Sequence, residues 1–212
     1  MTLESAFPWI SAASALAAGF AKADGRAGRA LRVLALVALA LFAYFRWITP
    51  TSVPMALACQ AIGQAMLPLG PERWRRLWIA LPVLGWLILA NLYRGAGDGL
   101  GVFVGDGFKA GLLAALVIGA GYGLWRTRRS APAPRPGLVA ETAALVVMGV
   151  MSLTLAWDFW PVMVGALLVL AAFALQVYGE RVSSALTSHA LARATWALGF
   201  VGQSAMAYAF LR

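Results

Sequence analysis

Charged residues, histidine and cysteine are scarce in this sequence, and their scarcity excludes several kinds of protein and site. Of 212 residues, 12% are charged and 62% are hydrophobic, whereas a soluble domain carries about 25% charged residues. Such a chain has too few polar side chains to cover a water-facing surface. Cys59 and His189 are the only cysteine and histidine, which excludes an intrachain disulfide, a thiolate metal site and a zinc site built on histidines. We expect no metal and no cofactor.

What the sequence does contain is a series of long apolar runs. Each is about 17 to 22 residues long, enough to cross about 30 Å of hydrocarbon as a helix. The eight runs are 5–21, 30–48, 52–69, 77–93, 108–125, 138–157, 160–178 and 190–211. They predict an all-α fold: a polytopic membrane bundle of about eight helices, in one domain over 1–212. The proline-rich stretch predicts a linker at 126–137, and glycine-rich 94–107 predicts an external loop. Gly119 and Gly123 form a GxxxG pair that predicts close helix packing.

The lysines and arginines are distributed unevenly between alternate loops. The loops after the first, third, fifth and seventh runs hold 13 of the 17 basic residues. Because cytoplasmic loops are enriched in Lys and Arg, both termini are predicted to lie outside the cytoplasm, in a multi-pass protein of a bacterial inner membrane. The net charge of +9 could indicate nucleic acid, but short basic clusters between apolar runs are what membrane topology requires. Membrane lipids are the expected partners, with other membrane subunits as further candidates.

A few polar side chains fall inside the apolar runs. Gln60 and Gln64 are four residues apart and share one helix face, and Gln203 lies in the last run. Polar groups are costly in hydrocarbon, so these glutamines either bond between helices to fix packing or border a polar pocket. Glu141 is the one credible carboxylate within a run, and it either lies at headgroup depth or takes part in chemistry. No residue is identified as catalytic, and Glu141 is the only weak candidate.

Three segments resemble the YhhN-type lysoplasmalogenase family. Gln60–Leu67 is similar to its S-x-x-G-D-x-x-L segment, Val164–Phe173 to its G-A-L-L-F-x-x-S-D stretch, and Gly199–Ala207 to its closing Y-x-x-Q-x-L-I-A. The resemblance implies an eight-helix fold that hydrolyses the vinyl ether bond of lysoplasmalogens. The cost of amides in hydrocarbon, together with the aligned position of Phe173, makes Gln60, Gln64, Phe173 and Gln203 the candidate pocket-lining residues.

The sequence departs from that family at the acids. Gln64 and Phe173 stand where the family has aspartates, and Trp86 stands near a position that is often histidine. Hydrolysis of a vinyl ether requires a proton delivered to carbon and then the addition of water. A glutamine cannot supply that proton, and a phenylalanine cannot either. The resemblance therefore implies a catalytically inactive relative.

Three functions stay open at this point. One is an inactive relative that binds lipid or serves as an accessory subunit of a larger membrane complex. Another is an active hydrolase of ether lysophospholipids, with Glu141 as the acid. The third is an unrelated small transporter or scaffold, for which Gln60, Gln64 and Gln203 would form a thin polar midplane.

Overall fold

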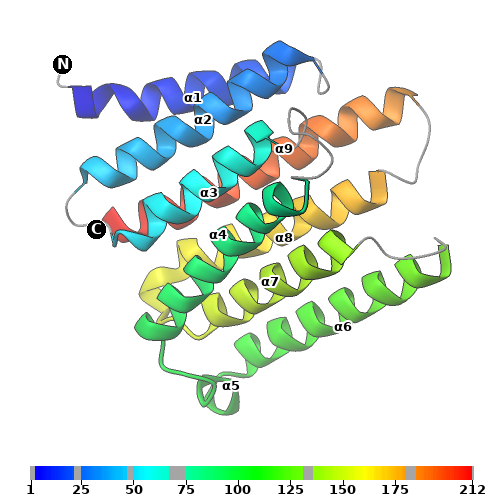
Figure 1. Ribbon diagram of the computed structural model, residues 1–212. Coiled ribbons are helices and arrows are strands. Elements are labelled where there is room, and N and C mark those ends of the chain that lie inside the picture. The colour runs from blue at the N-terminus through cyan, green and yellow to red at the C-terminus, as the bar shows by residue number, and fades with distance from the viewer. Residues whose placement is uncertain are drawn as a thin grey trace.

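The computed structural model describes residues 3–21, 25–46, 50–66, 75–130, 136–179 and 185–211. Within these residues the chain is all-α (Figure 1). The helices are α1 (Leu3–Phe20), α2 (Arg26–Phe45), α3 (Ser52–Met66), α4 (Arg75–Ala96), α5 (Val102–Gly105), α6 (Gly107–Ser130), α7 (Pro136–Leu153), α8 (Trp160–Gly179) and α9 (Ala185–Tyr208). Two 3₁₀ segments, Trp157–Phe159 and Ala209–Leu211, flank α8 and α9. Each predicted apolar run overlaps one of the eight longer helices.

Three of the described helical stretches are long and apolar enough to cross a membrane. They are Arg26–Phe45, Ile79–Ala96 and Trp157–Val177. Shorter apolar helices cover Ala6–Phe20, Gly107–Gly123 and Val139–Leu153. A multi-pass membrane protein is therefore compatible with the fold, because apolar helices satisfy their own backbone hydrogen bonds in lipid.

Several predicted boundaries need correction. The predicted linker 126–137 is too long, because α6 continues to Ser130 and α7 begins at Pro136. Proline suits the first position of a helix, where its missing N–H has no intrahelical partner to lose. Residues 131–135 of the linker lie outside the described residues. The run 138–157 ends as a helix at Leu153, and the loop predicted over 94–107 contains α5.

Successive longer helices run in alternating directions along the chain, and Figure 1 shows α1 at one edge of the array and α6 at the other. The pair α8 and α9 makes the most extensive contact, followed by α1 with α2 and α3 with α4. The helix α4 also packs on α7, and α9 packs on α1 and α2. These cross-contacts close the array into a bundle.

Glycines allow α8 and α9 to cross closely. A Cβ placed on Gly165 of α8 would lie 2.5 Å from the carbonyl oxygen of Gly202 of α9, and the reverse distance is also 2.5 Å. Small residues that let backbones touch are the usual basis of helix association in lipid. The predicted packing role of Gly119 and Gly123 is not seen, since a Cβ at either position would meet no described atom within 4 Å.

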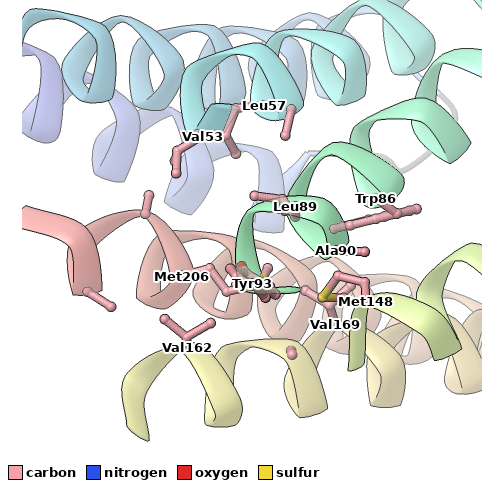
Figure 2. Close-up of a cluster of buried hydrophobic side chains, with 14 of the residues drawn as sticks. Val53, Leu57, Trp86, Leu89, Ala90, Tyr93, Met148, Val162, Val169 and Met206 are labelled. Carbon is pink, nitrogen blue, oxygen red and sulfur yellow. The ribbon is translucent and has the colours of Figure 1, made fainter. Parts of the chain in front are cut away.

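The hydrophobic core lies where α3, α4, α7, α8 and α9 meet. Figure 2 shows Tyr93 of α4, Met148 of α7, Val169 of α8 and Met206 of α9 converging there. Each is at most 4% exposed. Val169 and Trp86 belong to this core and also line the cavity described below, so the core supports one wall of the cavity.

Polar contacts connect the helices at the end of the bundle where α6 begins. Asp106 caps α6 by accepting hydrogen bonds from the backbone N–H groups of Phe108 and Lys109, both at 3.1 Å, as an N-cap residue does. Its other oxygen accepts a 2.9 Å bond from the indole N–H of Trp157. The Lys109 ammonium is buried, donates to the carbonyl oxygen of Leu155 at 2.6 Å and lies over the Trp157 ring. Asp106 and Lys109 thus connect the start of α6 to the segment between α7 and α8.

Candidate ligand-binding cavity

Six helices line a partly open cavity of about 690 Å³, within the range of about 300–1,000 Å³ typical of small-molecule sites. Its lining residues come from α2, α3, α4, α7, α8 and α9. Most lie near the ends where α2, α4, α7 and α9 begin and where α3 and α8 end, at the opposite end of the bundle from Asp106. The charge distribution of the sequence predicts that this half faces the cytoplasm.

The residues singled out in the sequence come together around this cavity. Gln60 and Gln64 line it from α3, Phe173 from α8, Gln203 from α9 and Glu141 from α7. The proximity of Glu141 to these residues could not be inferred from the sequence, because it depends on how α7 packs on α4 and α8.

Gln60 is held by a close contact between α3 and α4. Its side-chain N–H donates a 3.0 Å hydrogen bond to the carbonyl oxygen of Pro82. Gly85, one turn further along α4, makes the approach possible: a Cβ there would lie 2.9 Å from the Ala56 carbonyl oxygen and 3.0 Å from the Gln60 amide nitrogen. Gln60 therefore serves interhelical packing and cavity lining together, so the two alternatives posed by the sequence are not exclusive.

Two arginines that the sequence pattern places among the loop charges belong to the cavity. Arg29 and Arg32 lie in the first turns of α2, which begins at Arg26 and not near residue 30. Both arginines line the cavity. Spacing of three residues on a helix places two side chains on one face, which was a signal available in the sequence. The spacing alone did not identify a site, because arginines near a helix end that is predicted to face the cytoplasm are also expected from membrane topology.

A cation–π contact with Trp196 positions one of these arginines, Arg32. The guanidinium carbon of Arg32 lies 5.4 Å from the ring centroid of Trp196 on α9. The indole N–H of Trp196 donates a 3.1 Å hydrogen bond to the carbonyl oxygen of Ala15 on α1. A guanidinium over an aromatic face is attracted by the ring. The helices α1, α2 and α9 thus all contribute to the position of Arg32.

The remaining wall is amphipathic. Gln176 and Thr195 add neutral polar groups, and Leu145, Val169 and Phe200 add apolar surface. Among the described lining residues Glu141 is the only carboxylate. Gln64 and Phe173 occupy the cavity where the family resemblance has acids. The described residues contain no group of three or more His, Cys, Asp or Glu that could hold a metal ion. This lining suits a ligand with one polar end and one apolar end.

The fold and the site together define the class of protein. It is an all-α bundle in which three of the described helices are long and apolar enough to cross a membrane, and an amphipathic cavity lies in one half of the bundle. No protein-family model, curated protein or solved structure matches the chain.

Proposed function

We propose that this protein crosses the inner membrane eight times with both termini outside and binds a single-chain lipid in its cavity without hydrolysing it. The observation that carries the proposal is the cavity itself. It combines two arginines and several glutamines with an apolar wall, inside a chain whose outer surface carries large exposed hydrophobic residues. A ligand with a polar headgroup and an apolar tail would satisfy both parts of such a lining.

The lining also supports binding over catalysis. Proton transfer to carbon followed by water attack is most readily served by two groups that can exchange protons. Glu141 is one such group, and the positions of Gln64 and Phe173 offer none. We therefore propose that the chain shares its fold with the lysoplasmalogenases but has lost the acids of that family.

Filling the cavity should abolish lipid binding. Ala172 is 5% exposed and lines the cavity, so we expect Ala172→Trp to remove measurable binding of a lysophospholipid to purified protein. Ala174→Trp is the matched control, because Ala174 is exposed on the same helix and is not among the lining residues. Both variants are checked by thermal unfolding, because overpacking costs about 1–3 kcal/mol. Equal binding by the two folded variants would exclude this cavity as the lipid site.

The hydrolase remains the second candidate because Glu141 lines the cavity. The expected result with a lysoplasmalogen is no release of aldehyde above the uncatalysed rate. Turnover by the unaltered protein that disappears in Glu141→Gln would establish an active enzyme with Glu141 as its acid, and would defeat the proposal of a non-hydrolysing binder.

A further inference from the structure

One buried amide on the cavity wall has no hydrogen-bond partner among the described residues. Gln203 of α9 lines the cavity and is only 7% exposed, and no described group bonds to its side chain. The polar side-chain atoms of the described residues that are enclosed without a partner include the indole nitrogen of Trp86 but neither amide atom of Gln203. The Gln203 amide is therefore open to the cavity that it lines.

An amide in this position favours a ligand that can bond to it. A buried polar group without a hydrogen bond costs free energy. In a bundle that crosses a membrane, acyl chains cannot supply the missing bond. A ligand that offers a donor or an acceptor to Gln203 recovers this free energy, whereas a purely apolar ligand deprives the amide of water and recovers nothing.

The backbone that carries this amide is held closely against the neighbouring helix. Gly202, the residue before Gln203, lies at the crossing of α8 and α9. A Cβ on Gly202 would lie 2.5 Å from the Gly165 carbonyl oxygen and 3.1 Å from the backbone nitrogen of Val169. A side chain that starts from a fixed backbone has less freedom to lose when a ligand binds.

A second amide, on α3, is oriented by its own hydrogen bond. The side-chain N–H of Gln60 donates to the Pro82 carbonyl oxygen, which assigns the nitrogen to that side of the amide. Gln60 is 4% exposed and lines the cavity, and no described group donates to its amide oxygen. Gln60 therefore offers the cavity an acceptor, and Gln203 offers both a donor and an acceptor.

A hydroxyl is the neutral lipid group that donates one hydrogen bond and accepts others. From these observations, and resting on the proposed lipid-binding function, we propose that the cavity recognises a hydroxyl on a single-chain lipid through the amide of Gln203, with the amide oxygen of Gln60 as a further acceptor. An ester or ether oxygen is a poorer match, because it accepts hydrogen bonds and cannot donate to either amide oxygen. The hydroxyl belongs either to a glycerol backbone or to the chain.

Two pairs of probes, each differing by one hydroxyl, test this recognition and identify its source. Palmitoyl lysophosphatidylcholine is paired with its analogue that lacks the backbone hydroxyl, and stearate hydroxylated at mid-chain is paired with stearate. Each probe competes with a fluorescent lipid for the purified full-length protein. In at least one pair the hydroxylated member should bind about tenfold more tightly. The pair that shows the difference identifies the backbone or the chain as the source.

Gln203→Met tests the amide, because methionine removes the polar group and keeps much of the side-chain volume. The favoured hydroxylated probe should lose about tenfold in affinity, and its partner about twofold at most. The unfolding temperature of the lipid-free protein should not fall, because no described residue bonds to the lost amide. Ser204→Ala is the matched control and should keep the preference, since Ser204 is the next residue of α9 and is not among the lining residues.

The unfavourable outcomes have different meanings. Equal affinity within both pairs, measured on the unaltered protein, would overturn hydroxyl recognition and leave lipid binding standing. A preference that survives in Gln203→Met, an equal loss in Ser204→Ala, or a lowered unfolding temperature of lipid-free Gln203→Met would overturn the role of Gln203. Binding of none of the probes by the unaltered protein would overturn the proposed function and this inference together.

Discussion

At the scale of single residues, the same side chain can carry two kinds of information, and only one of them is visible in the sequence. Arg29 and Arg32 contribute to the uneven distribution of basic residues that predicts the topology, and they also line the cavity. Gln60 was recognisable as a costly polar group inside an apolar run. Its partner, the Pro82 carbonyl, belongs to a different helix, and no local pattern specifies it.

Asp106 gives a residue-scale prediction about acid stability. The backbone N–H of Lys109, aided by the Trp157 indole and the Phe108 N–H, holds the pKa of Asp106 below its ordinary value. A carboxyl with a lowered folded-state pKa contributes stability that is fully present above the unfolded-state pKa of about 3.9 and is lost as the pH falls through the lower folded value. Asp106→Asn should therefore flatten the dependence of the unfolding temperature on pH below about pH 4. An unchanged slope in this variant would show that ionisation of Asp106 does not contribute to the pH dependence of stability.

At the scale of elements, the apolar runs predict the helices well and their packing poorly. All eight runs contain a helix, because a stretch of about 20 apolar residues in this period has few alternatives. The observed helix ends differ from the predicted ones at α6 and α7, because Pro136 starts a helix within the predicted linker. The GxxxG pattern pointed to Gly119 and Gly123, whereas the close contact uses Gly165 and Gly202 from different helices. A spacing rule within one helix cannot identify a glycine pair that is split between two.

The glycine crossing of α8 and α9 can be tested by adding one methyl group. Gly165→Ala should destabilise the protein by about 1–3 kcal/mol, because the new Cβ would collide with the Gly202 carbonyl. Gly119→Ala is the control, since a Cβ there meets no described atom within 4 Å, and its stability should stay the same or rise slightly with the better helix propensity. Thermal unfolding in detergent measures both. A Gly165→Ala protein as stable as Gly119→Ala would mean that the crossing is looser than described.

At the scale of the whole molecule, the cavity is a product of the bundle, and it could be anticipated only in part. Gln60, Gln64, Phe173 and Gln203 all line it, and their role in binding stays a prediction. The support of Arg32 could not be foreseen, because Ala15 and Trp196 are 181 positions apart in sequence. Contacts of that separation depend on the assembled bundle.

Membrane topology is a prediction at this scale. In a Cys59→Ala background, single cysteines at Arg26 and Ser130 should resist an impermeant thiol reagent added to intact cells, because the basic loops are expected in the cytoplasm. Single cysteines at Asp98 and Asp158, which are exposed near the opposite helix ends, should react. Labelling of the Arg26→Cys protein from outside, with Asp98→Cys protected, would invert the topology.

The most direct test of lipid binding in the cavity is photocrosslinking with a lysophospholipid that carries a diazirine in its chain. The expected result is labelling of the α8 and α9 peptides that contain Phe173 and Phe200, displaced by excess unlabelled lipid and lost in Ala172→Trp. Labelling confined to outward-facing residues such as Ile118 and Tyr122 of α6, which are 70% and 54% exposed, and unaffected by unlabelled lipid, would contradict the assignment of the cavity as a lipid site.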